Sequence, residues 1–467
     1  MEFFTVVAVI AVLTAVSVYF LLTRLTTPSS SWPKTKQSQA YTRKVTPKKK
    51  KFQTSVNSLN DFAPEGAASA VRDVAGFFSR HGNQFSVYSI DWEQEMVVLV
   101  RPVDGADMKT HPFFREAQRR QAAEVLCVPL EELQDVASAV ADEVAHVQEI
   151  FIFMTARCGS TLVTRLVEAT SVAQAVSEPE VFTAISMTVH RLKLSSQRGQ
   201  TPPHRGCPAV LSSEESTVAL LRNIGILLNY NLVTSDPRHR DVIFYKFKPG
   251  VILLAELMAR AFPSAKTVFM YRNGLEVTES VKRIYFKQSY VLYATLRFAV
   301  RAGLLRRAFG SHDFMRCFGE DPKFSTVRYR STGLFNLYTW WAGAMQRAAN
   351  LQKKRPEYFF HAIIYYSALV HDKKKTFRLL MEKLGLTWSP DGPGQDTDKI
   401  EKVLTEDSQA GTVLSSRNSK RRLGEKWSPD VSPRWVGQWE REYMEEVCRH
   451  AGNEVSGPDF LLPDTVV

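Results

Sequence analysis

One stretch of the chain joins a short apolar run, a loop of small residues and an amphipathic helical pattern: IFIFMTARCGSTLVTRLVEATS. We expect Ile150–Met154 to form a buried parallel strand, because its side chains are all apolar. Gly159 permits close backbone approach, and the hydroxyls of Ser160 and Thr161 can hold an anion together with N–H groups of the first helical turn. Arg157 adds a positive charge. The stretch therefore predicts a loop that binds phosphate or sulfate.

Two common phosphate-binding loops do not fit this stretch. The loop of ATP-binding proteins needs a Lys directly after its last Gly, and no Lys follows Gly159. A tyrosine-phosphatase loop built on Cys158 needs an Arg at the position that Thr164 occupies, and Arg165 comes one residue too late. We interpret Cys158 as a small turn residue rather than a nucleophile.

A second group of candidate residues lies about a hundred positions further on. The run Thr267–Tyr271 predicts an apolar strand, followed by a turn and a helix that carries Ser280. Arg272 thus stands at the carboxyl end of a strand, where open α/β sheets bind their ligands. A surface ion pair is the alternative interpretation of Arg272.

Together these segments resemble the sulfotransferase family, whose donor is 3′-phosphoadenosine 5′-phosphosulfate (PAPS). The string T-x-R-x-G-S-T-L at 155–162 is similar to the family's 5′-phosphosulfate loop, and Tyr-Arg-Asn at 271–273 with Ser280 is similar to its 3′-phosphate site. The resemblance implies that the donor is bound without a metal ion. The implied donor-binding residues are Arg157, Cys158, Gly159, Ser160, Thr161, Leu162, Arg272 and Ser280.

The resemblance also implies the fold and the reaction. The expected fold is a three-layer, P-loop-like α/β domain with a central parallel sheet over residues 149–440. The expected reaction moves a sulfuryl group to a hydroxyl acceptor, and a glycan is the acceptor that the family favours. Two other functions stay open: a non-catalytic, nucleotide-binding scaffold tethered to a membrane, and a lipid or small-molecule sulfotransferase that faces the cytosol.

Three C-terminal segments bear on this site. The segment 363–386 is similar to a strand and helix of the family, although Ser367 and Ala368 replace its usual acidic residues. The segments 407–411 and 415–417 are polar, and the first contains a Gly. They predict either a lid over the nucleotide or a mobile surface loop.

The reaction needs a cation for the leaving group and a general base for the acceptor hydroxyl. Arg157 can neutralise the bridging oxygen of the leaving group. The sequence SEPE after the first helix resembles a Glu-Pro element of carbohydrate-type sulfotransferases, so we expect Glu178 to be the base, with Glu180 as second choice. The alternative is that both are solvated loop carboxylates. Lys246 and Lys248 would share one face of a strand end and are supporting candidates.

The N-terminus predicts a membrane anchor. Residues 3–22 carry no charge and are long enough to span a bilayer, and no basic segment precedes them as in a cleaved signal peptide. Residues 23–51 hold nine basic residues and no acidic ones, and their composition predicts a disordered stalk. With Glu2, the first 51 residues hold +8 of the net charge of +12. Nucleic acid is not an expected partner, because no folded basic motif accompanies this charge.

The side of the membrane that the catalytic domain faces is open. The family members with an N-terminal anchor are usually Golgi enzymes whose catalytic domain lies in the lumen. The resemblance therefore implies a Golgi location. The Lys- and Arg-rich flank instead favours the cytosol. The sequence contains no Asn-x-Ser/Thr sequon, and the spacing of its five cysteines is not typical of disulfides. Both observations also favour the cytosol.

Residues 52–148 predict an α+β extension. Helical patterns lie near 66–79, 112–126 and 130–145, and strand patterns lie at 85–91 and 95–100. Residues 441–467 are expected to form a C-terminal tail. No metal-ligand spacing or internal repeat occurs in the sequence.

Overall fold

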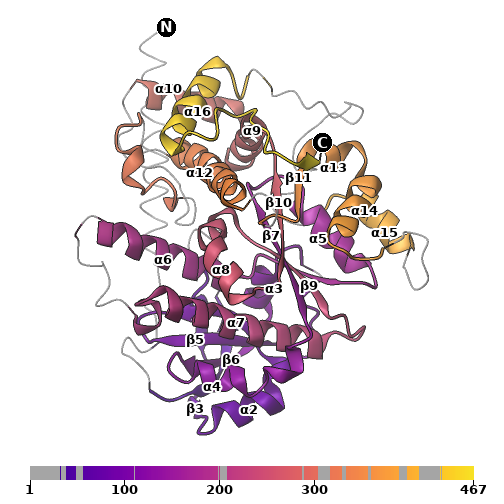
Figure 1. Cartoon of the computed structure of the whole chain (residues 1–467). Coiled ribbons are helices and arrows are strands. Elements are labelled where there is room, and N and C mark those ends of the chain that lie inside the picture. The colour runs from indigo at the N-terminus through magenta and orange to yellow at the C-terminus, as the bar shows by residue number, and fades with distance from the viewer. Residues whose placement is uncertain are drawn as a thin grey trace.

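Two six-stranded sheets organise the chain in the computed structural model (Figure 1). The structure describes residues 32, 38–48, 56–109, 111–197, 199, 208–286, 289–302, 316–328, 333–355, 359–388, 397–409, 432 and 434–466. The predicted anchor at 3–22 lies outside these residues. Among the residues described, no helix has the length and apolar character needed to cross a bilayer.

The N-terminal sheet is antiparallel, with the strand order β2-β1-β6-β5-β4 and β3 paired to β1. Three short helices accompany it, so this region is an α+β unit. The strands are β1 (Tyr41–Pro47), β2 (Phe62–Pro64), β3 (Ser69–Ala70), β4 (Ser86–Asp91), β5 (Met96–Pro102) and β6 (Ala122–Pro129). The helices are α2 (Val74–His81), α3 (Phe114–Gln121) and α4 (Leu133–Ser138).

Strand β1 corrects the prediction that residues 23–51 are a disordered stalk. Residues 41–47 are ordered because their backbone pairs with β6 on one side and with β2 and β3 on the other. Val45 is buried, and Lys44 lies opposite Glu124 in the register, an opposite-charge pair across strands. The α+β unit therefore begins before residue 52, the boundary expected from composition.

All three predicted helices in this unit are shorter than expected, and the pattern at 130–145 gives only α4. The pattern at 112–126 is helical only to Gln121, and β6 follows directly, because its residues 125–128 are buried between β1 and β5. The pattern near 66–79 becomes helical only at Val74, where the Asp73 carboxylate caps the helix by accepting from the N–H of Gly76.

The second sheet is parallel throughout, with the order β12-β11-β10-β7-β9-β8. The expected strands at 150–154 and 267–271 lie within β7 and β10, so the prediction of an α/β fold with a parallel sheet is confirmed. The strands are β7 (Gln148–Met154), β8 (Gln174–Ser177), β9 (Val242–Lys246), β10 (Lys266–Tyr271), β11 (Ala362–Tyr365) and β12 (Thr465–Val466).

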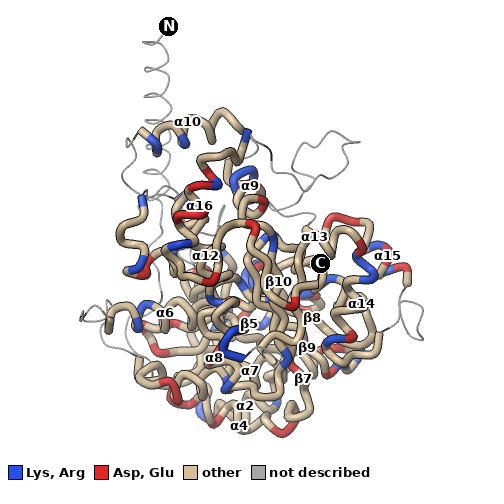
Figure 2. Tube along the Cα trace, turned by 45° about the horizontal axis from the view of Figure 1, so that its top comes forward, with Lys and Arg blue, Asp and Glu red and all other residues tan. Residues whose placement is uncertain are grey.

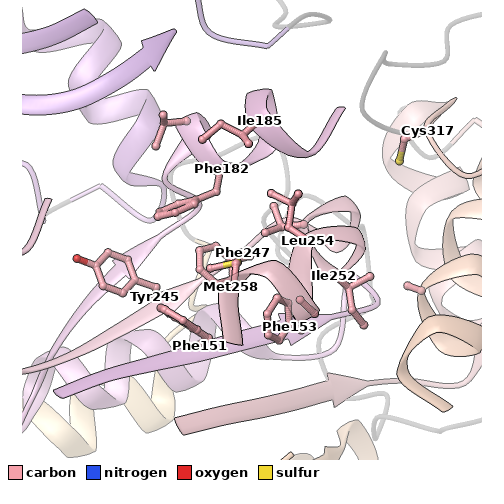
Figure 3. Packing of buried hydrophobic residues seen from close by; sticks show 14 of the residues in the cluster. Phe151, Phe153, Phe182, Ile185, Tyr245, Phe247, Ile252, Leu254, Met258 and Cys317 are labelled. Carbon is pink, nitrogen blue, oxygen red and sulfur yellow. The ribbon is translucent and has the colours of Figure 1, made fainter. Parts of the chain in front are cut away.

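Helices cover both faces of this sheet (Figure 1). Alternate side chains of β7 enter two different cores: Phe151 and Phe153 pack with residues of α6–α8 (Figure 3), and Ile150 and Ile152 pack with residues of α5, α14 and α15. The helices are α5 (Ser160–Ala169), α6 (Glu180–Gln197), α7 (Glu214–Ser235), α8 (Ala255–Ala261), α9 (Gly274–Tyr285), α10 (Tyr290–Arg301), α12 (Gly333–Lys354), α13 (Tyr366–His371), α14 (Lys373–Lys383), α15 (Thr397–Thr405) and α16 (Gln438–Ala451).

The C-terminal residues belong to the parallel-sheet unit, so the expectation of a separate tail at 441–467 is wrong. Strand β12 pairs with β11, and the hydroxyl of Tyr271 accepts from the N–H of Leu462 (3.1 Å) and lies 2.9 Å from the Thr465 hydroxyl. Helix α16 packs on α12 and α9. The reason is that Tyr271 is buried at the end of β10 and takes its hydrogen bonds from this segment.

The two sheets share one hydrophobic core. Val87 and Leu126 of the antiparallel sheet and Phe151 of β7 belong to the same buried cluster. Polar contacts tie the units as well, since the Tyr230 hydroxyl of α7 donates to the carbonyl of Ser79 (3.0 Å). Lys and Arg are interspersed with Asp and Glu over both units (Figure 2). The N-terminal unit is thus packed into the parallel-sheet unit through a shared core.

Candidate active site

The candidate site lies at the carboxyl edge of the parallel sheet, around β7. The chain runs from β7 to β8 and β9 on one side and then crosses to β10 on the other side. Such a point, where the strand order reverses, is where open α/β sheets bind their ligands. The predicted donor-binding and catalytic residues follow β7, β8 and β10 in the chain.

The loop after β7 has an unusual backbone. Ala156, Arg157 and Gly159 all have positive φ angles, of 70°, 52° and 80°. A Cβ at Gly159 would lie 2.6 Å from the Leu369 side chain, so the close packing of this loop on α13 requires glycine. Helix α5 then begins at Ser160, and the N-terminus of a helix is a favourable place for an anion. The predicted anion loop therefore has the backbone of a cradle.

The structure brings the two predicted donor-binding segments together. The Arg157 guanidinium donates through Nε to Ser280 Oγ of α9 (2.9 Å), and Arg272 Nη1 donates to the Arg157 carbonyl (3.4 Å). The Arg272 guanidinium lies 4.2 Å from the ring centre of Tyr366, and its Nε donates to Glu276 (2.5 Å). Because the Arg272 and Glu276 side chains are only 15% and 13% exposed, this pair is not the surface ion pair that the sequence left open.

The remaining loop residues are buried at the same place. The side chain of Cys158 is 1% exposed, and burial raises the pKa of its thiol, as expected for a packing residue rather than a nucleophile. Ser160 and Thr161 are 4% exposed, and Leu162 packs at the edge of the core beneath α5. Burial, followed by the nearby charge of Arg272, lowers the pKa of Arg157 to about 10.

The first residues of the predicted lid lie against this loop. The Gln409 side chain accepts from Arg157 Nη1 (2.5 Å) and donates to Thr161 Oγ1 (3.3 Å). Arg165 donates to the carbonyl of Asp407 (3.3 Å). Residues 410–417, the rest of the predicted lid, lie outside the described residues.

The two predicted catalytic carboxylates lie in a buried cluster of charges. Glu178 accepts from Lys246 Nζ (2.7 Å), and Glu180 accepts from Lys248 Nζ (2.7 Å). The carboxylates are 11% and 0% exposed, so the alternative that they are solvated loop residues is wrong. Glu178 has a φ of 60°, and its N–H donates to the carbonyl of Lys246 (2.7 Å), which fixes the residue at the sheet edge.

The charges of the cluster act on each other. Burial alone would raise the pKa of Glu178, but Lys246, Arg115 and Lys248 outweigh it and lower this pKa to about 2. Burial and then Arg115 lower the pKa of Lys248, although Glu180 acts in the opposite direction. Glu178 is therefore ionised at neutral pH.

Arg115 of α3 is a member of the cluster that the sequence did not indicate. Its Nε lies 3.3 Å from Glu178 and 3.8 Å from Glu180. The sequence shows a basic helix at this position, but no pattern links it to carboxylates more than sixty residues away. Tyr366 and Trp341, whose indole donates to the Arg272 carbonyl (2.9 Å), were also not singled out as donor-site residues, whereas Gln409 lies in the segment 407–411 that was predicted as a lid.

Within the described residues, no group of three or more His, Cys, Asp or Glu side chains could hold a metal ion.

The fold and the site together define a class: an α/β protein with an anion cradle at the switch point of its parallel sheet. Residues 149–330 match the sulfotransferase family, so the resemblance seen in the motifs is confirmed and this segment is a sulfotransferase-family domain. The match supports sulfuryl transfer as the reaction.

Several solved sulfotransferases are similar to the chain. One from Mycobacterium tuberculosis is 13% identical, with 60% of this chain and 81% of that chain covered and a TM-score of 0.30. The sulfotransferase domain from the curacin biosynthetic pathway is 14% identical, with 57% and 81% covered and a TM-score of 0.30. One from Alicyclobacillus acidocaldarius is 14% identical, with 55% and 89% covered and a TM-score of 0.27. No curated protein matches the chain.

Proposed function

We propose that this protein transfers a sulfuryl group from PAPS to a hydroxyl acceptor. The observation that carries the proposal is the meeting of Arg157, Arg272 and Ser280 beside the N-terminus of α5. Two guanidinium groups at one sheet edge repel each other, and this repulsion lowers the pKa of Arg157 in addition to the larger effect of burial. An anion bound between them relieves this repulsion. PAPS has such an anion at both ends.

The parts of the site divide between the two ends of the donor. The first turn of α5, with Ser160, Thr161 and the Arg157 side chain, suits the 5′-phosphosulfate. Arg272 and Ser280 suit the 3′-phosphate, as in the motif that they resemble. Cys158 and Leu162 support the loop by packing beneath it.

The chemistry follows from the charges on either side of β7. The sulfur–oxygen bond to the leaving nucleotide breaks while a bond forms between sulfur and the acceptor oxygen. Negative charge grows on the leaving phosphate, next to Arg157. The acceptor proton passes to Glu178. In a loose transition state the acceptor hydroxyl becomes acidic only as the new bond forms, so a weakly basic carboxylate is sufficient.

We propose a glycan as the acceptor, because the SEPE segment resembles the Glu-Pro element of carbohydrate-type sulfotransferases. Its two carboxylates lie on the β8–β9 side of β7, opposite the β10 side that carries the 3′-phosphate residues. The acceptor would therefore enter from the β8–β9 side. We also propose that residues 3–22 anchor the protein in the Golgi membrane.

The test uses the full-length chain in detergent micelles. Calorimetry should show binding of adenosine 3′,5′-bisphosphate, and PAPS should transfer sulfate to oligosaccharides in a panel that also contains phenols and sterols. Failure to bind the bisphosphate overturns the proposal. Binding without transfer to any acceptor favours the non-catalytic scaffold, and transfer only to sterols or phenols replaces the glycan with a lipid or small molecule.

A further inference from the structure

The N-terminal unit places a cation between the two carboxylates of the site. Arg115 Nε lies 3.3 Å from Glu178 Oε2 and 3.8 Å from Glu180 Oε2. Lys246 holds the other oxygen of Glu178, Oε1, at 2.7 Å. Each oxygen of Glu178 is thus held by a cation from a different unit, which fixes the plane of the carboxylate.

Helix α3 is anchored so that Arg115 reaches this position. The Gln118 amide donates to Ser86 Oγ and to the Val87 carbonyl, both at 2.9 Å, which ties α3 to β4. At the start of the helix, the Phe113 ring lies 5.2 Å from Lys246 Nζ and covers the cluster. The Arg115 side chain is 18% exposed. Its place is therefore set by buried contacts within the N-terminal unit.

We propose that Arg115 is a positioning residue for Glu178. The N-terminal unit would then supply one of the side chains that orient the acceptor's general base. The inference rests on the proposed function, in which Glu178 receives the acceptor proton. Residue 115 lies outside the segment that matches the sulfotransferase family, which begins at 149. The family motif alone does not contain this part.

The charges around Glu178 explain why an arginine suits this position. Three cations, Arg115, Lys246 and Lys248, face two carboxylates, Glu178 and Glu180. A planar guanidinium presents several N–H groups and can approach two carboxylates at once, whereas an ammonium is a single point charge. Without Arg115, Glu178 Oε2 loses this contact and the carboxylate can turn about its bond to Lys246.

The same contact sets the protonation of Glu178. Burial favours its neutral form, and Lys246, Arg115 and Lys248 hold it ionised. Removal of Arg115 takes away one of these cations, so the pKa of Glu178 must rise. Because the base works only when it is ionised, the pH at which activity falls on acidification should rise as well.

The experiment compares Arg115→Ala, Arg115→Lys and the control Arg120→Ala in the full-length chain. Arg120 lies on the same helix, is 62% exposed and pairs with Glu116, which keeps Arg119 as a partner. Each variant is measured for kcat from about pH 3 to pH 8, because the pKa of Glu178 is about 2 in the wild type, and for affinity for adenosine 3′,5′-bisphosphate.

Arg115→Ala should lower kcat by on the order of 10- to 100-fold, the usual cost of a displaced catalytic group. Its activity should fall at a higher pH than that of the wild type, and its bisphosphate affinity should stay within about twofold, since the donor residues are untouched. Arg115→Lys should restore the acid side of the profile and part of kcat. Arg120→Ala should match the wild type.

Three results would overturn the inference. They are wild-type kcat and pH profile in Arg115→Ala, loss of bisphosphate binding together with activity, and strictly additive losses when Arg115→Ala is combined with Glu178→Gln. The second result would show a purely structural role. No transfer by the wild type to any acceptor would instead overturn the proposed function, and the inference with it.

Discussion

Arg272 is the residue on which donor affinity should depend most. Its guanidinium already pairs with Glu276 and stacks on Tyr366, so it is positioned before the donor arrives. A hydrogen bond to a charged group contributes roughly 1.5–3 kcal/mol, so Arg272→Ala should weaken bisphosphate binding by about tenfold to a hundredfold. Calorimetry measures the effect.

The matched control for this prediction is Arg283→Ala, since Arg283 forms an i,i+4 pair with Glu279 within α9. We expect Glu276→Gln to retain or tighten bisphosphate binding, because it releases Arg272 for the ligand. Equal affinity in Arg272→Ala and wild type would show that the pair with Glu276 is structural only.

Glu178 should matter for turnover and not for donor binding. Glu178→Gln keeps the shape of the side chain but removes its ability to take a proton, so kcat should fall by about 10²- to 10⁴-fold. The affinity for the bisphosphate should not change. Since Lys246 and Arg115 lose a buried partner, near-ultraviolet circular dichroism must first show that the variant is folded. If Glu180→Gln abolishes transfer while Glu178→Gln retains it, Glu180 is the base.

At the scale of elements, α9 joins the donor site to a buried polar contact among four helices. Lys282 of α9 donates to the Tyr293 hydroxyl of α10 (2.7 Å) and the Tyr338 hydroxyl of α12 (3.2 Å), and it lies 3.8 Å from Glu440 of α16. Arg297 also pairs with Glu440 (3.0 Å). Burial lowers the pKa of Lys282 to about 7, although Glu440 acts in the opposite direction.

This lowered pKa predicts how stability changes with pH. Between pH 7 and about 10 the unfolded chain keeps a proton on Lys282 that the folded chain has lost, so this residue's contribution to the free energy of unfolding rises with pH, by up to about 1.4 kcal/mol per pH unit. Below pH 7 its contribution is constant. Lys282→Met should remove the rise, because Glu440 retains Arg297 as a partner.

Urea unfolding at pH 7 and pH 9 measures the effect. The control is Lys374→Met, which removes a lysine that is 52% exposed. The same pH dependence in Lys282→Met and wild type would contradict the prediction.

Local patterns predicted the elements that carry the donor site and missed those fixed by distant pairing. Strand β7, its loop and α5 follow one another in sequence, so apolar runs and a glycine were enough to place them. The start of β6 falls in a helical sequence pattern, because only its pairing with β1 and β5 decides its conformation. Arg115 could not be found for the same reason, since its partners follow much later in the chain.

At the scale of the whole molecule, the position of β1 bears on which side of the membrane the folded domain faces. Lys and Arg hold a flank in the cytosol mainly when they lie within about 15–20 residues of the anchor. Of the nine basic residues between 23 and 51, only Arg24, Lys34 and Lys36 precede β1, and Arg43 and Lys44 belong to the folded sheet. The charge that resists translocation is therefore smaller than the composition indicates.

We therefore expect the catalytic domain to face the Golgi lumen. In sealed vesicles, added protease should leave it intact until detergent opens the membrane. An antibody to the C-terminal residues follows the fragment, and a known cytosolic tail on another protein serves as the positive control for digestion. Digestion of the domain without detergent would contradict the prediction and favour the cytosolic orientation.

The position of Gln409 has a consequence for the rate at which the donor arrives. Its amide binds Arg157 and Thr161, two groups that the sulfate end of PAPS would need. The ligand can then enter only in the fraction of time during which this amide is displaced, so the observed association rate should level off as ligand concentration rises. Stopped-flow measurements should show this plateau in the wild type and a linear dependence in Gln409→Ala. Gln409 would thus slow the binding of the nucleotide.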